Sequence, residues 1–365
     1  MAVTAGTLGL ALLVAPGLTR TESPPPAADV AAAAARLGLH GPTNAALRHF
    51  RAWGMTSTEV LTRFSDLYND ERELVPGWKP SAALRTTLDE LEGYINLSLR
   101  AAQLDSADWG IEYADGWMAL LPHLGKLRQE ARVLEMKARV LLAGDAGANP
   151  EDRARGISIL AAMFRLASHT RNDRTMISTL VGGAMARQAS LVVKALADQG
   201  VLRREDAPTL LAALDSLAGP DPFNLAGCVP IEQHLGASLF TQTGPDAGRK
   251  AVPVAREMLE VDQAADDQAV RRRQSILARI EAMDEAALRA DVARMSEFFT
   301  LGERALRTPG PDTAQQLAAL EERVATGEFG VTVQIIAPSM SKAFATNASN
   351  LAELAEARAV LSRLK

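Results

Sequence analysis

The densest group of chemically capable side chains lies between residues 108 and 123. This stretch gathers carboxylates, aromatic rings and an imidazole in a chain whose aromatic content is only 4%. Aromatic rings beside carboxylates are what a small polar ligand or a sugar ring meets in a binding pocket. We therefore predict a ligand- or partner-binding site here. Its residues are Asp108, Trp109, Tyr113, Asp115, Trp117 and His123.

The same residues also have a purely structural interpretation. Trp109 and Trp117 would then fill a gap between helices, because large aromatic side chains bury much apolar area. Asp115 would cap a helix, and Pro122 with His123 would simply open the next helical turn. For residues of these types a structural role is more common than a role in binding. Both interpretations of residues 108–123 stay open.

A second polar group follows on one helix face. Its members recur at spacings of 4, 3 and 4, and they are Arg128, Arg132, Glu135 and Arg139. Such spacing places them on one face, opposite a stripe of leucines. This face would bind an anion, a phosphate or an acidic partner, so Arg128 and Arg132 join the predicted site. The alternative is a solvated face with an ion pair between Glu135 and Arg139.

Patterns for metal binding and nucleophilic catalysis are missing from the sequence. The 5 histidines include no pair at a helical spacing. The single cysteine, Cys228, lies near Glu232 and His234, but residues two apart on a helix point to different sides. Neither G-x-S-x-G, H-E-x-x-H nor a glycine-rich phosphate loop occurs. We predict no metal site and no cofactor.

Composition indicates helices. Hydrophobic residues make up 47% of the 365 residues, and alanine and leucine dominate them. Both are strong helix formers, whereas the β-branched and aromatic residues that favour strands are scarce. The net charge of −5 is spread along the chain. Without a domain-sized basic patch, we expect no binding to nucleic acid.

Apolar residues recur every three or four positions, which is typical of amphipathic helices. We predict an all-α fold, an irregular array of antiparallel helical hairpins that is partly tetratricopeptide-like or solenoid-like. Residues 120–143 with 151–169, and 173–199 with 204–218, should form hairpins. Apolar and polar residues alternate at 331–336, which indicates a short strand, and part of a helix stays open as the alternative. The other predicted helices are 56–69, 81–102, 224–242, 249–264, 268–283, 285–307, 313–326 and a last one from Pro338 to Leu364.

The domain organisation is predicted from composition breaks. Residues 1–28 hold a 12-residue apolar run, Thr7 to Leu18, and a proline-rich linker. The run suits a signal peptide and is too short to span a bilayer, yet no basic residue precedes it. Export and a cytoplasmic location both stay open. We predict an N-terminal helical array over 29–218 and a C-terminal helical region over 223–365. The break Gly219-Pro220-Asp221-Pro222 separates them, or the two regions pack as one continuous domain.

Residues 80–240 resemble a group of uncharacterised bacterial helical proteins. The resemblance is carried by Asp108-Trp109-Gly110, then Leu120-Leu121-Pro122-His123-Leu124, then an Ala/Leu/Arg-rich helical region with Arg128, Arg132 and Arg139. In that group a D-W-G stretch precedes an L-L-P-H-L helix start. No activity is attached to the group, so the resemblance implies a helical fold and a location in the cell envelope, and no function.

Two classes of function remain. The first is a non-enzymatic helical scaffold or binding module that takes a protein partner or a small polar ligand, with no transmembrane span and an open oligomeric state. The second is an enzyme whose site is assembled from distant residues around 108–123. We favour the first, because catalytic chains usually show at least one dense polar constellation. A cleft shared by His123 and a carboxylate would favour the second.

Overall fold

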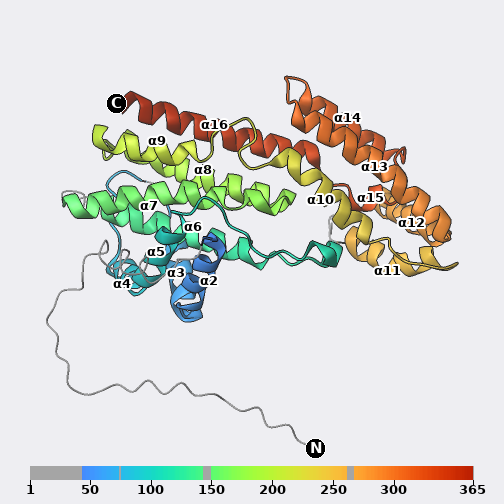
Figure 1. Ribbon diagram of the computed structural model, residues 1–365, viewed down its shortest axis with the longest axis horizontal. Coiled ribbons are helices and arrows are strands. Elements are labelled where there is room, and N and C mark those ends of the chain that lie inside the picture. Colours follow the sequence, from blue (N-terminus) through green and yellow to red (C-terminus); the bar gives the residue numbers. More distant parts are fainter. Residues whose placement is uncertain (1–42, 74, 143–148, 261–266, 365) are drawn as a thin grey trace, which may run out of the picture. The chain divides into compact units, whose positions relative to one another are not determined.

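The computed structural model describes residues 43–73, 75–142, 149–260 and 267–364. Every regular element in these ranges is helical, which confirms the all-α prediction (Figure 1). The segment Thr43–Lys365 forms one compact unit. The signal-like run and the linker predicted at 1–28 lie outside the described residues. The repeat-like character stays a prediction.

The first helices begin where a polar side chain caps the first turn. Asn44, Ser57 and Ser81 each accept a hydrogen bond from a backbone N–H two or three residues further on, which satisfies a donor that the helix itself leaves unpaired. The elements of this part are α2 (Ala45–Gly54), α3 (Thr58–Glu71), α4 (Ala82–Glu90), α5 (Glu92–Ala101), the 3-10 turn η1 (Tyr113–Met118), α6 (Pro122–Leu142) and α7 (Pro150–Ser168).

The prediction of one long helix over 81–102 is wrong, because the chain bends at Leu91. Leu91 has φ −84° and ψ 6°, outside the helical region, and is fully buried. The bend lets α4 pack on α3 and α6, while α5 packs on α2 and α7. A straight helix would keep one apolar stripe and one set of neighbours.

The remaining elements form the second half of the array. They are η3 (Arg171–Asp173), α8 (Met176–Asp198), η4 (Arg204–Asp206), α9 (Ala207–Asp215), α10 (Leu225–Ser238), α11 (Ala247–Glu260), α12 (Asp267–Glu281), α13 (Glu285–Arg307), α14 (Thr313–Ala325), α15 (Val333–Ile336) and α16 (Met340–Leu364). Of the two alternatives left open at 331–336, the strand is therefore wrong, and the helix is present as α15. The buried carboxylate of Asp291 accepts hydrogen bonds from the Thr332 backbone N–H (2.8 Å) and hydroxyl (2.9 Å), which turns the chain into α15.

Helix α8 lies at the centre of the array, between α7 and α16 (Figure 1). A Cβ added at Gly182 would lie 2.1 Å from Thr170 Oγ1, and one added at Gly183 would lie 2.4 Å from Asn350 Nδ2. The glycine pair thus allows close helix contacts on two sides. Among the described residues α8 is also the one helix long and apolar enough to span a membrane by length and composition, and 61% of that stretch is buried within the fold.

Of the two predicted helical hairpins, the first is present and the second is not. Helices α6 and α7 pair along their length, as predicted. Helix α9, by contrast, packs mainly on α7 and α16 rather than on α8. The last helix, α16, takes the place beside α8 that the hairpin prediction gave to α9 (Figure 1). A contact between segments so far apart in the chain leaves no local sequence pattern.

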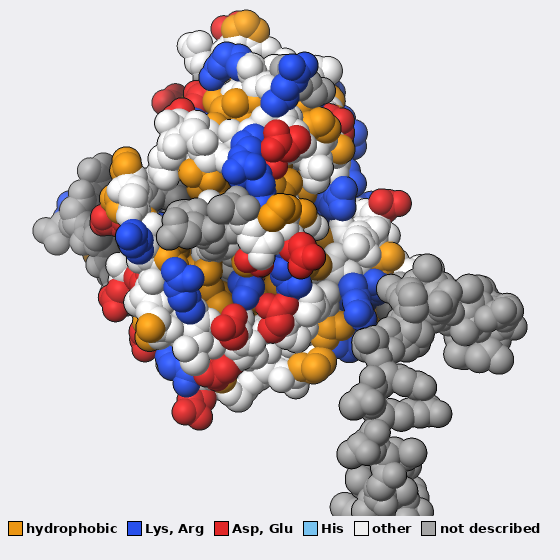
Figure 2. Space-filling view, turned by 90° about the vertical axis from the view of Figure 1, so that its left-hand side faces the viewer, with side chains coloured by type: hydrophobic (Ala, Val, Ile, Leu, Met, Phe, Trp, Pro, Cys, Tyr) orange, Lys and Arg blue, Asp and Glu red, His pale blue; other side chains and the backbone are white. Residues whose placement is uncertain are grey.

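The described core has three hydrophobic clusters. The first joins α2 to α9 with the end of α16, and includes Leu134 and Leu361. The second lies among α10, α13, α14 and the start of α16, around Phe298 and Met340. The third joins the chain after α10 to α11 and α12. On the face in Figure 2, basic and acidic side chains are interspersed, without a large region of one sign.

Candidate functional site

The predicted site residues begin in the segment between α5 and α6. Asn44 holds the start of this segment: its Oδ1 accepts from the Asp108 N–H at 2.8 Å, and its Nδ2 donates to the Asp108 carbonyl at 2.7 Å. The exposed Asp108 carboxylate accepts from the Gly110 N–H at 3.0 Å. Such a bond shapes a turn. Asp108 therefore positions the residue between them, Trp109.

Trp109 lies at the centre of an aromatic stack and is only 7% exposed. Its ring stacks on His123 with the centroids 4.7 Å apart and on Trp53 at 5.7 Å. Its Nε1 donates to the His169 carbonyl at 3.1 Å. The indole therefore has apolar neighbours on its faces and a partner for its N–H, which is the usual arrangement of a buried tryptophan.

His123 and Asp173 form a buried pair beneath Trp109. Their side chains approach to 2.7 Å between His123 Nε2 and Asp173 Oδ2, and each is 2% exposed. The Tyr113 hydroxyl donates to the Asp173 backbone carbonyl. Burial, followed by the charge of Asp173, raises the pKa of Tyr113 to about 12. Tyr113 therefore stays an uncharged donor at neutral pH.

A cavity of about 350 Å³ lies against this segment. Among its lining residues are Asp108, Trp109, Tyr113 and Asp173, whereas His123 is not one of them. The imidazole thus supports the wall from behind and does not face the cavity. An acid–base role for His123 would require hydrogen-bond reach to a substrate, which this placement does not provide.

A second buried network lies next to the stack, and the sequence patterns did not indicate it. His49 Nδ1 lies 2.9 Å from Glu130 Oε1, and both side chains are fully buried. His49 Nε2 lies 3.1 Å from His169 Nδ1. Trp53 Nε1 donates to Glu130 Oε2 at 2.9 Å. The one sequence signal for a buried Glu130 is its place next to the apolar stripe of helix 120–143. That stripe does not indicate that His49 is the partner of Glu130.

The direction of the hydrogen bonds defines the protonation states. His169 Nε2 lies 2.8 Å from the Leu104 carbonyl, which can only accept, so His169 carries its proton there. Burial, and then the charge of His49, lowers the pKa of His169 to about 4, so its Nδ1 is free to accept from His49. Burial alone would raise the pKa of Glu130, but the charge of His49 and the hydrogen bonds from His49, Ser98 and Trp53 together hold that pKa below the usual value. Glu130 is therefore a buried carboxylate that is paired with His49.

We expect this network to make stability depend on pH. The unfolded chain binds a proton at His169 below about pH 6.5, while the folded chain binds it only near pH 4. Between these pH values the unfolded state holds more protons than the folded state. The free energy of unfolding should therefore fall as the pH is lowered from about 6.5 to about 4, by up to about 3 kcal/mol. The lowered pKa of Glu130 adds to the loss at still lower pH.

Urea unfolding at several pH values between 4 and 7 measures this effect. His169→Gln keeps a donor for the Leu104 carbonyl and an acceptor for His49, but it does not titrate. Its stability should therefore change less with pH than that of the natural chain. Equal pH dependence of the two proteins would show that His169 is not the group responsible.

The later residues of the segment contact α10 instead. The Trp117 backbone N–H donates to Ser238 Oγ at 2.8 Å, and His234 Nε2 lies 3.2 Å from the Tyr113 carbonyl. The Trp117 side chain is 40% exposed. Asp115 is exposed on η1 and caps no helix in the described structure. The predicted residues 108–123 are thus divided between a buried stack and the surface of α10.

Arg128 and Arg132 lie at a separate place, a cavity of about 480 Å³ between α3, α6 and α8. Its polar lining comprises four arginines, one carboxylate, a phenol and an amide, and these residues are Arg72, Arg128, Arg132, Arg187, Glu135, Tyr68 and Gln188. We call this cavity the arginine pocket. The sequence placed Arg128 and Arg132 correctly on one face, but Arg72 and Arg187 come from other helices.

Part of that face of α6 is buried, so the alternative of a solvated face fails at Glu135 and Arg139, although the ion pair that it predicted between them is present. Glu135 and Arg139 are each 3% exposed, because α6 is covered by α3, α7 and α8. Arg139 donates to the Glu73 carbonyl at 2.7 Å and stacks over Trp78 at 4.2 Å. It also lies 3.4 Å from Glu135. A buried guanidinium needs such partners, since leaving it unpaired is costly.

Glu135 forms the floor of the arginine pocket. It accepts hydrogen bonds from Gln188 Nε2 and from the Tyr68 hydroxyl, the latter at 3.2 Å. Burial raises the pKa of Glu135 although these donors and Arg139 act against it. Burial first, and Glu135 second, raise the pKa of Tyr68 to about 12. The floor is therefore fully hydrogen-bonded, and it holds the Tyr68 ring beneath Arg132, 5.3 Å from its guanidinium.

The arginines around the floor have few counter-charges. Within the described ranges, no carboxylate lies in ion-pair distance of Arg72, Arg128 or Arg132. Arg187 has only a long contact, 3.8 Å to Glu353. Arg128 and Arg132 are four residues apart on α6, where like charges repel. A cluster of this kind is the usual environment for a carboxylate or phosphate ligand.

The region near Cys228 offers no comparable site. Cys228 is fully buried, and burial, followed by the charge of Glu232, raises the pKa of its thiol far above the usual value. Glu232 accepts from the Met176 N–H at 2.6 Å and so serves the first turn of α8. In the part of the chain that is described, no group of three or more His, Cys, Asp or Glu side chains is placed to hold a metal ion.

Comparisons of this chain with protein-family models, with curated proteins and with solved structures found no match.

Proposed function

We propose that this protein is a helical binding module for a small anionic molecule, which it holds in the arginine pocket. The observation that carries the proposal is the group of four arginines around a cavity of about 480 Å³. Among the described residues, Arg72, Arg128 and Arg132 have no carboxylate within ion-pair distance, and Arg187 has one at 3.8 Å. A volume of this order is that of an ordinary small-molecule site. Carboxylate and phosphate oxygens match the donors of guanidinium groups.

The repulsion among the arginines of the ligand-free pocket, which lowers the stability of the protein, supports this interpretation. Arg128 and Arg132 repel each other on α6, and Arg187 and Arg72 bring two more positive charges to the same cavity. Like-charge pairs at this spacing destabilise a helix by about 0.2–0.5 kcal/mol. An arrangement that lowers stability is expected where function requires it. A bound anion would remove the repulsion.

The pocket also has features that would orient a ligand. The Tyr68 ring and the carbon chains of Leu191 and Val192 line the same cavity as the arginines. A ligand with an anionic group and a short organic body would use both. Glu135, whose oxygens are already paired with Tyr68, Gln188 and Arg139, would keep a second anionic group away from the floor.

The enzyme alternative around 108–123 has less support. His123 is packed under Trp109 and paired with Asp173, and it does not line the adjacent cavity. His49 and His169 are buried in their own network. Among the described residues, His49, His123 and His169 therefore do not line the cavity beside residues 108–123, and none of the three is placed there as general acid–base catalysis requires.

Isothermal titration with citrate and inorganic phosphate, and with uncharged glucose as the comparison, tests the proposal. The natural chain should bind citrate and phosphate in preference to glucose. The double variant Arg128→Ala/Arg132→Ala should lose about tenfold or more in affinity, since hydrogen bonds to charged groups contribute about 1.5–3 kcal/mol each and exposure reduces that value. Its free form should be as stable as the natural chain or slightly more stable.

Arg304→Ala is the matched control. Arg304 is an exposed arginine on α13, so its loss changes the net charge without touching the pocket. Anion binding should be unchanged in this variant. The proposal is wrong if the natural chain shows no preference for the anions, or if Arg304→Ala weakens binding as much as one pocket substitution does.

A further inference from the structure

We propose that Glu353 on α16 regulates the anion affinity of the arginine pocket, as an internal carboxylate that competes with the ligand for Arg187. The inference rests on the function proposed above, and it adds how the same site is controlled. Among the described residues, those that line the pocket include none from α16. Glu353 therefore acts through Arg187 and does not touch the ligand.

Arg187 lines the pocket and also contacts α16. It belongs to α8, and its Nη2 lies 3.8 Å from Glu353 Oε1. That separation is within ion-pair range but too long for a hydrogen bond. The side chain of Arg187 is exposed, and its guanidinium donates no hydrogen bond within the described ranges. Arg187 is therefore free to turn toward a ligand, and it then leaves its contact with Glu353.

Lys194 holds Glu353 beside Arg187. Its Nζ donates to Glu353 Oε2 at 2.9 Å, while Oε1 is the oxygen that contacts Arg187. Lys194 follows Arg187 by about two turns on the same face of α8. Hydrogen bonds to Glu356, and then to Glu353, raise the pKa of Lys194, so it stays charged at neutral pH. The Glu353 carboxylate therefore lies between two cations of α8.

Close packing of α16 on α8 fixes the backbone at Glu353. A Cβ added at Gly183 on α8 would lie 2.4 Å from Nδ2 of Asn350, which is buried one turn before Glu353. Leu354, the residue after Glu353, is buried in the first hydrophobic cluster. Such close-packed contacts leave little room for movement, and they keep the Glu353 carboxylate within reach of Arg187.

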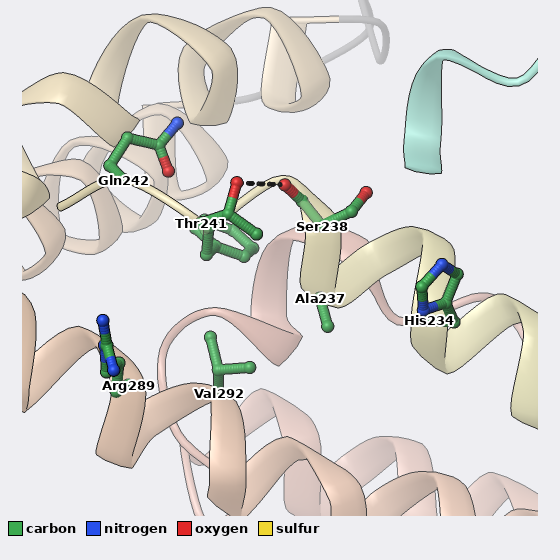
Figure 3. Close-up of a pocket in the computed structure, with 8 residues that line it drawn as sticks. His234, Ala237, Ser238, Thr241, Gln242, Arg289 and Val292 are labelled. Carbon is green, nitrogen blue, oxygen red and sulfur yellow. Dashed lines mark hydrogen bonds between the residues drawn. The ribbon is translucent and has the colours of Figure 1, made fainter. Parts of the chain in front are cut away.

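The contact of Arg187 is weak in comparison with that of another arginine beside a cavity. Arg289 on α13 lines the cavity between α10 and α13 (Figure 3), and it donates to Glu285 on its own helix. The hydrogen bond from the Gly244 backbone N–H, followed by the charge of Arg289, lowers the pKa of Glu285, so this carboxylate stays charged. Arg289 is therefore already hydrogen-bonded to its counter-charge, whereas Arg187 is not. A ligand meets less competition at Arg187.

The competition reaches one of the four arginines of the pocket. Within the described ranges, Arg72, Arg128 and Arg132 have no carboxylate in ion-pair distance, so Glu353 weakens anion binding without preventing it. A partly exposed ion pair corresponds to a factor of about two to five in an equilibrium constant. The coupling is reciprocal: a bound anion draws Arg187 away from Glu353 and weakens one contact between α8 and α16.

Isothermal titration of the full chain with citrate tests the inference, at about 0.15 M ionic strength, where charges more than about 8 Å apart are largely screened. Glu353→Gln should bind citrate about two- to fivefold more tightly than the natural chain, because Arg187 is then free. Glu356→Gln is the matched control. It removes the same charge from the same helix, and the ion-pair partner of Glu356 is Lys194. It should change the affinity clearly less than Glu353→Gln does.

A double-mutant cycle with Arg187→Gln completes the test. Arg187→Gln should weaken citrate binding, and adding Glu353→Gln should then have no further effect, since the two residues share one contact. If Glu353→Gln fails to fold, as circular dichroism would show, Glu353→Asp takes its place. Its shorter side chain draws the carboxylate away from Arg187, and it should also tighten binding.

The inference is overturned if Glu353→Gln does not tighten binding, if Glu356→Gln tightens it equally, or if the effect of Glu353→Gln persists without Arg187. The variant Arg128→Ala/Arg132→Ala separates this failure from that of the proposed function. Weaker citrate binding by that variant, together with no effect of Glu353→Gln, would reject the inference and retain the function. A natural chain that does not bind citrate would reject both.

Discussion

His49→Ala should lower the free energy of unfolding by about 3–5 kcal/mol. The substitution removes the imidazole that is paired with Glu130, whose fully buried carboxylate lies 2.9 Å from His49 Nδ1. The carboxylate would then be left in the core with Trp53 as its main hydrogen-bond donor. His169 would lose the donor that serves its Nδ1. An uncompensated charge in a low-dielectric interior is among the costliest defects that a single substitution produces.

Guanidinium-induced unfolding followed by circular dichroism measures this loss. The informative control is the double variant His49→Leu/Glu130→Met, which replaces the pair with apolar side chains of similar volume. Because burying an ion pair carries a large desolvation penalty, such a replacement is often neutral. The double variant should therefore be more stable than His49→Ala. If the double variant instead lost at least as much free energy of unfolding as His49→Ala, the unpaired carboxylate of Glu130 would not be the reason for the loss.

Trp109→Ala should cost about 3–5 kcal/mol as well, the usual range for truncating a buried tryptophan. The variant would lose the stacking on His123 and Trp53 and the hydrogen bond to the His169 carbonyl. It would also expose the His123–Asp173 pair to water. The thermal midpoint should fall by several degrees.

Trp117→Ala is the matched control, since it removes the same residue type from the same segment. Its side chain is 40% exposed, and the structure gives it only a backbone bond to Ser238, which alanine keeps. Surface substitutions of this kind usually change stability by less than about 0.5 kcal/mol. Equal losses from the two variants, or an unchanged midpoint for Trp109→Ala, would contradict the buried role of Trp109.

The sequence revealed only part of the arginine pocket. Arg128 and Arg132 could be placed together because a helix brings residues four apart onto one face. The cavity that they line also needs Tyr68, Gln188 and Arg187 from other helices, and no local pattern links those residues.

Local sequence alone determined most helices of this protein. Their caps, apolar stripes and glycine or proline breaks act within a few residues, as the hydrogen bonds that Ser57 and Ser81 accept from the first turns of α3 and α4 illustrate. These features depend on the chain's nearest neighbours and on the geometry of the helix.

The tertiary structure decided everything that joins distant segments. His49, Glu130 and His169 meet across separations of 81 and 120 residues, and α16 returns to pack beside α8. The bend at Leu91 and the turn at Thr332 exist because neighbouring helices and Asp291 supply the contacts. The physical reason is that packing and buried pairing depend on which helix faces fit together in space. The sequence pattern shows which face of a helix is apolar, but not which other face it contacts.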